Sequence, residues 1–304
     1  MRLYINTNNH LDLVKEFQFK LEKEIQVLTE KNLKTVFGYD FVKSEFSISN
    51  FRIDTLAFDD TSSSFVIIEY KKDKNFSVID QGYAYLSLML NNKSDFILEY
   101  NENKKRSLKR NDVDWSQSKV IFISPSFTTY QREAINFKDL PIELWEIRRF
   151  SNESIMYNQI PKSGATESIK TISRRDDTIE NVNKEIKVYT ESEHIAQSDD
   201  DITELYERLK SMILNLEGVE LQPKKKYIAF IGNSNIVDIH IQKKSLKLWI
   251  NLPLTELDDP KQLTRDVSNI GHWGNGSHEI QINDDENLEY IMSLIKQSYK
   301  KNKK

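Results

Sequence analysis

The sequence predicts a mixed α/β core followed by a smaller α+β domain. Three observations support this fold class. Helical and extended segments alternate over residues 1–160, a polar stretch with few aromatic residues occupies 161–200, and a second set of helices and strands fills 201–304. We therefore expect a core domain over 1–160, a linker over 161–200 and a C-terminal domain over 201–304.

The composition is that of a folded, water-soluble protein. The chain has 304 residues, of which 38% are hydrophobic, 30% are charged and 11% are aromatic, and its formal net charge is -4. No apolar run approaches the ~18 residues of a membrane span, and the N-terminus has no apolar signal segment. The chain has no cysteine, which excludes disulfides, thiolate catalysis and thiolate-bound metal centres. We expect a cytoplasmic protein with no membrane association, in which any binding of nucleic acid comes from local basic patches.

Hydrophobic spacing predicts the elements of the first domain. Apolar residues at helical intervals predict an amphipathic helix from about 11 to 35, which ends before Gly38. Short extended runs separated by turn-like residues then predict an antiparallel meander. The remaining expected elements are strands at 41–48, 51–58 and 65–71, a helix at 76–91, strands at 95–100 and 119–124, a helix, and strands at 144–150 and 155–160.

The second domain is expected to begin with an amphipathic helix at 202–216. Strands at 227–232, 236–242, 246–252 and 278–282 and a last helix at 285–300 follow. The segment GHWGNG (271–276) lacks the glycine patterns of nucleotide-binding loops, and we interpret it as a turn packed by Trp273. His240 stands between two isoleucines of a strand, which favours a structural role.

Charged residues interrupt two neighbouring strands of the first domain. Side chains alternate along a strand, so Glu69 and Lys71 share one face with Phe65 and Ile67. Asp54 lies on the preceding strand, from which it could approach Glu69. A carboxylate and an ammonium at the edge of an apolar face are costly unless they are paired or bound to a metal.

This arrangement indicates a divalent cation site. Two close carboxylates repel each other, and a cation removes that repulsion. Carboxylate oxygens suit Mg²⁺ or Mn²⁺, and the neighbouring lysine could orient a water or stabilise charge on a phosphate. The alternative is an exposed cross-strand pair of charges on a solvated sheet edge.

The order of these residues resembles a known nuclease motif. Asp54 followed by Glu69-Tyr70-Lys71 resembles the motif of the PD-(D/E)XK nuclease superfamily, with Ile53 in place of the proline. Arg52-Ile53-Asp54 looks like the corresponding segment of NucS-like endonucleases. The resemblance covers roughly residues 15–100.

Two further segments extend the resemblance. Gln81 and Tyr85, four residues apart on one helix face, are similar to a pair found in RecB-like nucleases. Glu22-Lys23-Glu24-Ile25 resembles a segment of Holliday-junction resolvases in which the first glutamate completes the site. Helical phase instead places Glu24 on the apolar stripe, so Glu24 remains the alternative to Glu22.

The resemblance implies a restriction-endonuclease-like core and a Mg²⁺- or Mn²⁺-dependent nuclease that acts on DNA. Its implied metal ligands are Asp54, Glu69 and the backbone carbonyl of Tyr70, and its implied catalytic residues are Asp54, Glu69, Lys71, Gln81 and Glu22. The alternative is the same fold used without catalysis, either to bind nucleic acid or as a protein-interaction module. The oligomeric state stays open, with a homodimer as one arrangement.

Two regions outside this motif bear on substrate binding. The basic run Lys104, Lys105, Arg106, Lys109 and Arg110 could contact phosphates or could be a solvated loop, and the sequence does not decide between them. The C-terminal domain resembles a domain of unknown function labelled "predicted transport protein", a label for which the residues give no physical support. We expect this domain to add selectivity for a substrate or partner.

Overall fold

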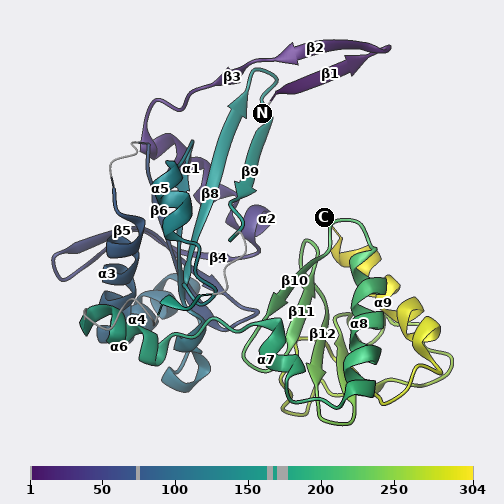
Figure 1. The fold of residues 1–304 in the computed structure, drawn as a ribbon. Helices are drawn as coiled ribbons and strands as arrows, with labels where there is room; N and C mark the ends of the chain where they lie inside the picture. Colours follow the sequence, from purple (N-terminus) through teal and green to yellow (C-terminus); the bar gives the residue numbers. More distant parts are fainter. Residues whose placement is uncertain (1, 73–75, 163–166, 170–176, 304) are drawn as a thin grey trace. The chain divides into compact units, whose positions relative to one another are not determined.

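The computed structural model describes residues 2–72, 76–162, 167–169 and 177–303, and it divides the chain into two compact units, Met1–Val188 and Tyr189–Lys304 (Figure 1). The boundary lies inside the segment 161–200 that was expected to be a linker. Ile169, Val182 and Ile186 are buried in the core of the first unit, so this part of the segment is packed. The expected linker also includes 163–166 and 170–176, which lie outside the described residues.

The first unit is built on a mixed sheet, which confirms the expected fold class. In the order of pairing, its strands are β3 (Glu16–Phe17), β8 (Ile142–Phe150), β7 (Lys119–Ser124), β6 (Ser64–Tyr70), β5 (Phe51–Asp59) and β4 (Asp40–Ile48), and β9 (Ile155–Gln159) also pairs with β8. Strands β4, β5 and β6 form the predicted antiparallel meander, whereas β6, β7 and β8 run parallel. Every residue of β6 is buried, as expected for a strand covered on both faces.

Helices cover both faces of this sheet (Figure 1). Helices α1 (Glu22–Lys31) and α2 (Leu33–Phe37) pack on one face, and α3 (Val78–Asn91), α4 (Lys93–Lys104) and α6 (Asp177–Glu185) pack on the other. Helix α5 (Thr129–Ala134) and two 3₁₀ turns, η1 (Arg110–Asp112) and η2 (Trp115–Gln117), complete the unit. Within the described residues, every helix is too short or too polar to span a membrane.

Helix α3 packs against the sheet at Gly82, where the side chain of Ile142 occupies the space that a Cβ would take. A Cβ at Gly82 would lie 2.4 Å from Cδ1 of Ile142, which is shorter than any normal carbon–carbon contact. Ser77 caps the start of this helix, because its Oγ accepts a hydrogen bond from the backbone N–H of Asp80. The close packing brings the first turns of α3 over the end of β6.

Two sequence-based assignments in this unit were wrong. The expected helix over 11–35 begins only at Glu22, and the residues before it form the hairpin of β1 (Leu3–Thr7) and β2 (His10–Val14), followed by β3. The expected strand at 95–100 is part of α4. Phe96 and Tyr100 are buried four residues apart, as on a helix, and Leu98 is exposed.

The second unit is an antiparallel sheet with two long helices on one face (Figure 1). Its strands, in the order of pairing, are β10 (Glu220–Pro223), β11 (Ile228–Ile231), β12 (Asn235–Ile241), β13 (Leu246–Ile250), β15 (His278–Ile282) and β14 (Arg265–Asp266). Its helices are α7 (Glu191–Ile195), α8 (Asp200–Leu214) and α9 (Leu288–Asn302). The smaller C-terminal α+β domain expected from the sequence therefore has the expected helices and strands, and it also contains α7, β10 and β14, which were not expected.

The glycine-rich segment 271–276 lies against the other face of this sheet. A Cβ at Gly274 would lie 2.5 Å from the ring of Trp249, and one at Gly276 would lie 2.3 Å from the carbonyl oxygen of Ile250. The segment is therefore a close-packed turn, as expected, but the tryptophan beneath it is Trp249. Trp273 itself is 51% exposed, which corrects its assigned role as the packing residue.

A buried carboxylate holds this segment in place. Asp238 on β12 is fully buried, and its Oδ2 accepts hydrogen bonds from the backbone N–H of Asn275 (2.6 Å) and from Asn275 Nδ2 (3.1 Å). Its Oδ1 accepts a hydrogen bond from Asn235 Nδ2 (2.7 Å). Burial raises the pKa of Asp238 to about 6, and the hydrogen bonds from the two asparagines oppose that shift.

We expect the stability of the second unit to fall as pH rises from about 4 to about 6. In this window the folded Asp238 keeps its proton while the unfolded chain releases it near its ordinary pKa of 3.8. The slope should be at most about 1.4 kcal/mol per pH unit, and stability should level off above about pH 7. Amide hydrogen exchange of β12 and β13 at several pH values measures this dependence of stability on pH.

Asp238→Asn should remove this slope, and Asp266→Asn is the matched control. Asp266 is an exposed carboxyl of the same region, and a hydrogen bond from Ser268 lowers its pKa, so its replacement should leave the fall in place. A carboxyl titration of Asp238 near pH 4, followed by ¹³C NMR, would contradict the expected shift.

Candidate active site

The pairing of β5 with β6 brings the two predicted carboxylates together. Thr55 is paired with Ile68 in this antiparallel register, so the next residues along, Asp54 and Glu69, stand opposite each other. Directly opposite residues point to the same face of a sheet. For Glu69 this is the face of Phe65 and Ile67, which are buried in the core beneath α3, as the strand phase predicted.

Glu69 is a buried carboxylate with two partners on one oxygen. Its exposed fraction is 4%, and its Oε1 accepts hydrogen bonds from Lys71 Nζ (2.8 Å) and Gln81 Nε2 (3.0 Å). Its Oε2 is also buried, and among the described residues no group donates to it. A buried carboxylate oxygen without a donor is costly, so this atom has unused capacity to bind a cation or a proton.

Asp54 is bound to the backbone of the neighbouring strand. Its Oδ2 accepts a hydrogen bond from the backbone N–H of Tyr70 (3.1 Å). Burial, followed by the negative charge of Glu69, raises the pKa of Asp54 to about 6, while the Tyr70 N–H and Lys71 oppose the shift. The two carboxylates therefore interact electrostatically across the strands.

Helix α3 supplies the amide and the phenol of the predicted pair. Gln81 and Tyr85 face the same way, and Gln81 Nε2 donates both to Glu69 Oε1 and to the Tyr85 hydroxyl (3.2 Å). Burial, with a contribution from Glu69, raises the pKa of Tyr85 well above its usual range, so the phenol is neutral at physiological pH. The structure thus places Asp54, Glu69, Lys71 and Gln81 at one end of the sheet.

Of the two glutamates of α1, Glu22 lies beside this end of β6. Its Oε1 accepts a hydrogen bond from the backbone N–H of Lys72 (2.7 Å), the residue after Lys71. Glu24 instead accepts a hydrogen bond from the backbone N–H of Lys20 (3.2 Å) at the start of its own helix. Position therefore favours Glu22 over Glu24 as the helix carboxylate near the site.

Gln26 also supports the site, and the sequence reasoning missed it. Its Nε2 donates to the backbone carbonyl of Asp54 (2.8 Å) and to Ser44 Oγ (3.1 Å), which ties α1 to β5 and β4. Gln26 follows Glu22 by four residues, and a polar residue on the buried side of a helix was the available signal.

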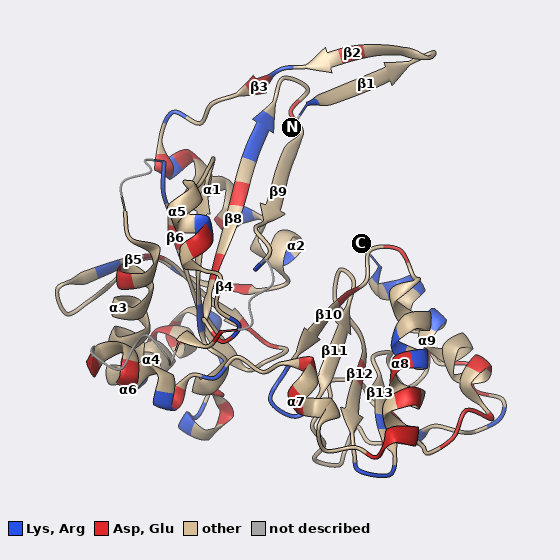
Figure 2. Cartoon of the chain, in the orientation of Figure 1, with Lys and Arg blue, Asp and Glu red and all other residues tan. Residues whose placement is uncertain are grey.

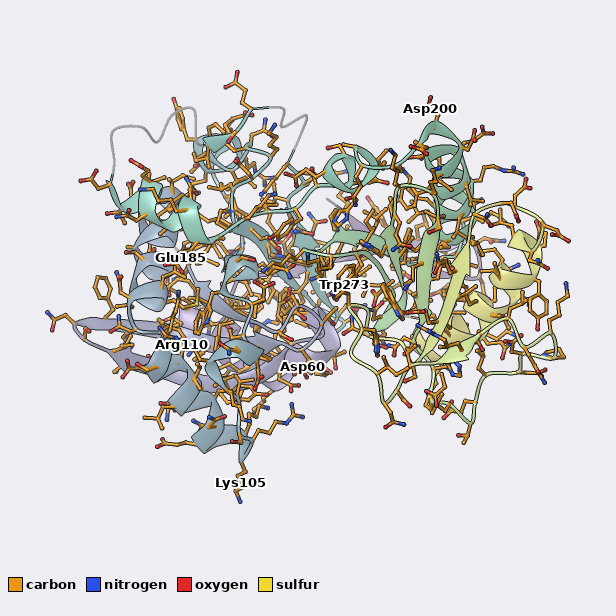
Figure 3. All side chains as sticks on the ribbon, turned by 90° about the horizontal axis from the view of Figure 1, so that it is seen from below. Asp60, Lys105, Arg110, Glu185, Asp200 and Trp273 are labelled. Atoms are coloured by element: carbon orange, nitrogen blue, oxygen red, sulfur yellow. The ribbon has the colours of Figure 1, made fainter. Side chains whose placement is uncertain are left out.

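The predicted basic loop lies away from these carboxylates. Arg106 Nη1 donates to the Tyr100 hydroxyl (3.1 Å) and lies 3.6 Å from Asp60, which follows the far end of β5. At roughly 3.3 Å per residue, that end is about 16 Å from Asp54 along the strand. Lys105 points into solvent at the tip of the unit (Figure 3). The loop therefore does not line the candidate active site.

The donors available to a cation here are few. Across the part of the chain that the structure describes, no group of three or more His, Cys, Asp or Glu side chains is arranged to hold a metal ion. A cation at this site would use Asp54, Glu69 and backbone oxygen, and would keep several waters. Mg²⁺ is commonly bound through one or two carboxylates with retained waters, so the donor set fits that ion.

Comparisons with known proteins place the chain in a family. A protein of Haemophilus influenzae (strain ATCC 51907 / DSM 11121 / KW20 / Rd), described as an uncharacterized protein, is 57% identical over 301 residues, which are 99% of this chain and 100% of that protein. The chain belongs to the family of that protein. Residues 191–302 match the family described as "Domain of unknown function (DUF5655)".

Two solved structures resemble part of the chain. A repair endonuclease from Pyrococcus abyssi is similar at 17% identity and a TM-score of 0.23, over 40% of this chain and 45% of that chain. EndoMS in complex with double-stranded DNA is similar at 15% identity and a TM-score of 0.21, over 39% of this chain and 43% of that chain. The chain spans under half the length of each of these two proteins.

Lys71→Met should destabilise the protein in the absence of divalent cations by about 1–3 kcal/mol, because it leaves Glu69 buried with one donor fewer. The double variant Lys71→Met/Glu69→Leu should recover much of that loss, since a buried ion pair replaced by apolar groups is often close to neutral. Urea unfolding in EDTA measures the free energy of unfolding of the wild type, of Lys71→Met, of Glu69→Leu and of the double variant. If the loss in the double variant equals the sum of the losses in the two single variants, the two residues are not coupled.

Proposed function

We propose that the first unit is a Mg²⁺- or Mn²⁺-dependent nuclease that hydrolyses phosphodiester bonds of DNA. The observation that carries this proposal is the buried Oε2 of Glu69, which has no donor among the described residues although it lies opposite a second carboxylate, Asp54. The Asp…Glu-x-Lys order, with Gln81 bound to Glu69, also supports a site of the PD-(D/E)XK type.

Asp54, Glu69 and the backbone carbonyl of Tyr70 would hold the cation. When bound, such a cation polarises the scissile phosphate and lowers the pKa of a bound water. Lys71 would move from Glu69 toward the phosphate, where its charge offsets the negative charge that develops during cleavage. Gln81 would keep the Glu69 carboxylate in its orientation.

Glu22 supplies a further carboxylate at the edge of the site. Because its Oε1 accepts a hydrogen bond from the backbone N–H of Lys72, Glu22 is held next to the Glu-x-Lys segment. We assign it the task of orienting a water on this side of the site.

The alternative function is a module of the same fold that binds nucleic acid or a protein without cleavage. One observation favours it: Lys71 lies 2.8 Å from Glu69 and neutralises that carboxylate without a metal. A site of this kind would be stable and inactive.

A cleavage assay on single-stranded, duplex and branched DNA, with Mg²⁺, Mn²⁺ or EDTA, decides between the two. Metal-dependent cleavage is expected, and Asp54→Ala, Glu69→Ala and Lys71→Ala should each reduce its rate by at least about 100-fold, because these groups stabilise the same charge. Because these three residues act together in the same step, cleavage by a double variant should be little slower than cleavage by a single variant.

Matched controls lie on the same elements. Asp80→Ala changes an exposed acid in the first turn of α3 and should leave the rate near normal. Glu22→Ala should slow cleavage more than Glu24→Ala. A near-normal rate for Asp54→Ala or Glu69→Ala would move the chemistry elsewhere, and the absence of cleavage on every substrate would support the binding module.

Metal binding should be measurable without any substrate. Mg²⁺ at about 100 times its dissociation constant should stabilise the protein by about 2.7 kcal/mol. Asp54→Ala and Glu69→Ala should abolish this gain, whereas Lys71→Ala should keep it because an ammonium is not a metal ligand. Calorimetric titration and thermal unfolding measure both effects, and an equal gain in all three variants would place the metal at another site.

A further inference from the structure

The second unit carries an aromatic and basic surface on the sheet face opposite to α8 and α9. We call it the Trp273 surface, and it consists of Lys226, His240, His272 and Trp273. The exposed Lys243 and Lys244 lie in the β12–β13 turn at the same end of the sheet. The helices pack against the side chains of β12 and β13 that point the other way, such as Ile239 and Leu248. The nuclease proposal for the first unit uses none of these residues.

Trp273 is an exposed indole within an ordered cluster. Its exposed fraction is 51%, the His240 ring meets it edge-on at 4.6 Å between centroids, and Lys226 Nζ lies 5.1 Å from the ring centre. Beneath it, the buried Trp249 stacks with His272 at 6.2 Å. These partners fix the ring and leave about half of its surface in water.

The loop that carries Trp273 is held on both sides. Gly274 and Gly276 allow it to lie directly on Trp249 and on the backbone of β13, and Asp238 binds both nitrogens of Asn275. A loop fixed in this way presents the indole in one position before any ligand arrives. Such preorganisation lowers the entropic cost of binding.

Basic residues occur in the segments next to this indole, and the acidic run at the start of α8 contacts one of these segments, where the backbone N–H of Asp199 donates to the carbonyl of Lys243 (2.9 Å). Residues 224–227, 240–247 and 271–276 contain no Asp or Glu, and their lysines are Lys224, Lys225, Lys226, Lys243, Lys244 and Lys247. Pairing of Ile228 with Ile239 and of Ile241 with Leu246 brings the first two segments to one end of the sheet. Figure 2 shows the basic stretches at the turns that join β10 to β11 and β12 to β13.

A second carboxylate on this face, besides the Asp238 that binds Asn275, has cationic partners. Glu279 accepts hydrogen bonds from Trp249 Nε1 (3.0 Å) and from Arg265 Nη2 (2.7 Å), and Lys247 lies 3.6 Å from it. Burial lowers the pKa of the His240 ring, which favours its neutral form, although the hydrogen bond from its Nδ1–H to the carbonyl of Lys226 (2.6 Å) acts in the opposite direction. The surface therefore combines aromatic rings with the charge of Lys226, which lies over the Trp273 ring.

We propose that the Trp273 surface binds unpaired nucleotides, with a base stacked on Trp273 and the flanking phosphates near Lys226, Lys243 and Lys244. The proposal rests on the proposed function only for its choice of nucleic acid as substrate. Aromatic rings among basic side chains are how proteins bind single strands, because every base has a flat face to stack and every nucleotide has a phosphate.

Other anionic partners fit this surface less well. In duplex DNA the faces of the bases are covered by their neighbours, so an indole cannot stack on them without opening the helix. An acidic peptide would pair with the lysines but offers no planar group to Trp273.

The experiment uses the full chain in EDTA, so that cleavage does not interfere. Binding of a fluorescent oligodeoxythymidine of about 20 nucleotides, and of a duplex of equal length, is followed by anisotropy. Trp273→Ala should weaken single-strand binding by about 5- to 100-fold, and Trp273→Phe should restore most of it, since stacking is the interaction removed. Tyr130→Ala, which removes the 89% exposed aromatic side chain of α5, is the matched control and should bind normally.

Salt dependence tests the lysines separately. Lys243→Ala/Lys244→Ala should reduce the slope of log affinity against log salt by about 1.4, at roughly 0.7 for each phosphate contact on a single strand. The control Lys296→Ala/Lys300→Ala, which removes two exposed lysines of α9 on the other side of the sheet, should leave the slope unchanged.

Each result has a definite meaning. Unchanged single-strand affinity in a folded Trp273→Ala variant overturns the proposal, as does equal weakening of duplex and single-strand binding. Competition by a polyglutamate peptide that is equally strong for wild type and Trp273→Ala also overturns it and indicates an acidic protein partner. Binding that depends on Trp273 in a protein that cleaves nothing would keep this proposal and defeat the nuclease proposal.

Discussion

The first unit depends on how it accommodates one carboxylate, Glu69, within the core. A carboxylate on the core side of a central strand is costly unless charge and hydrogen bonds offset its desolvation. Lys71 provides the charge two residues further along the same strand, and Gln81 provides the amide from α3. That second contact requires α3 to lie close to the sheet, which Gly82 permits. The packing of α3, the burial of β6 and the geometry of the site thus all depend on the contacts that stabilise the buried Glu69.

The strands that carry this carboxylate pair were predictable because side chains on a strand alternate with period two. That period placed Glu69 and Lys71 on the face of Phe65, and it needed no tertiary information. The contact of Asp54 with the N–H of Tyr70 and the support from Gln26 were not predictable in the same way. They depend on the register between strands and on how α1 meets the sheet, which local spacing does not specify.

The wrong sequence-based assignments also arose because local spacing does not specify contacts between distant parts of the chain. Phe17 and Leu21 fit a helical stripe with Ile25, yet only Ile25 is buried, because the chain forms strands before it turns into α1. In the second unit, the packing of the glycine-rich turn was assigned to Trp273, which lies within that turn. Gly274 instead lies over Trp249, and that contact joins residues far apart in the sequence.

Each unit contains a buried carboxylate, Glu69 in the first and Asp238 in the second. Their hydrogen-bond partners and neighbouring charges differ, and these differences indicate which one has a structural role and which one is a candidate for catalysis. Asp238 accepts hydrogen bonds from neutral N–H donors on both oxygens, and the group anchors a loop. Glu69 has a cationic partner on one oxygen and no donor on the other, although it faces a second carboxylate. Burial of an unused acceptor costs free energy, and Asn235 Oδ1 beside Asp238 also bears that cost. What distinguishes Glu69 is therefore the second carboxylate opposite it, and under the proposed function a cation at Oε2 would offset both the burial and the repulsion.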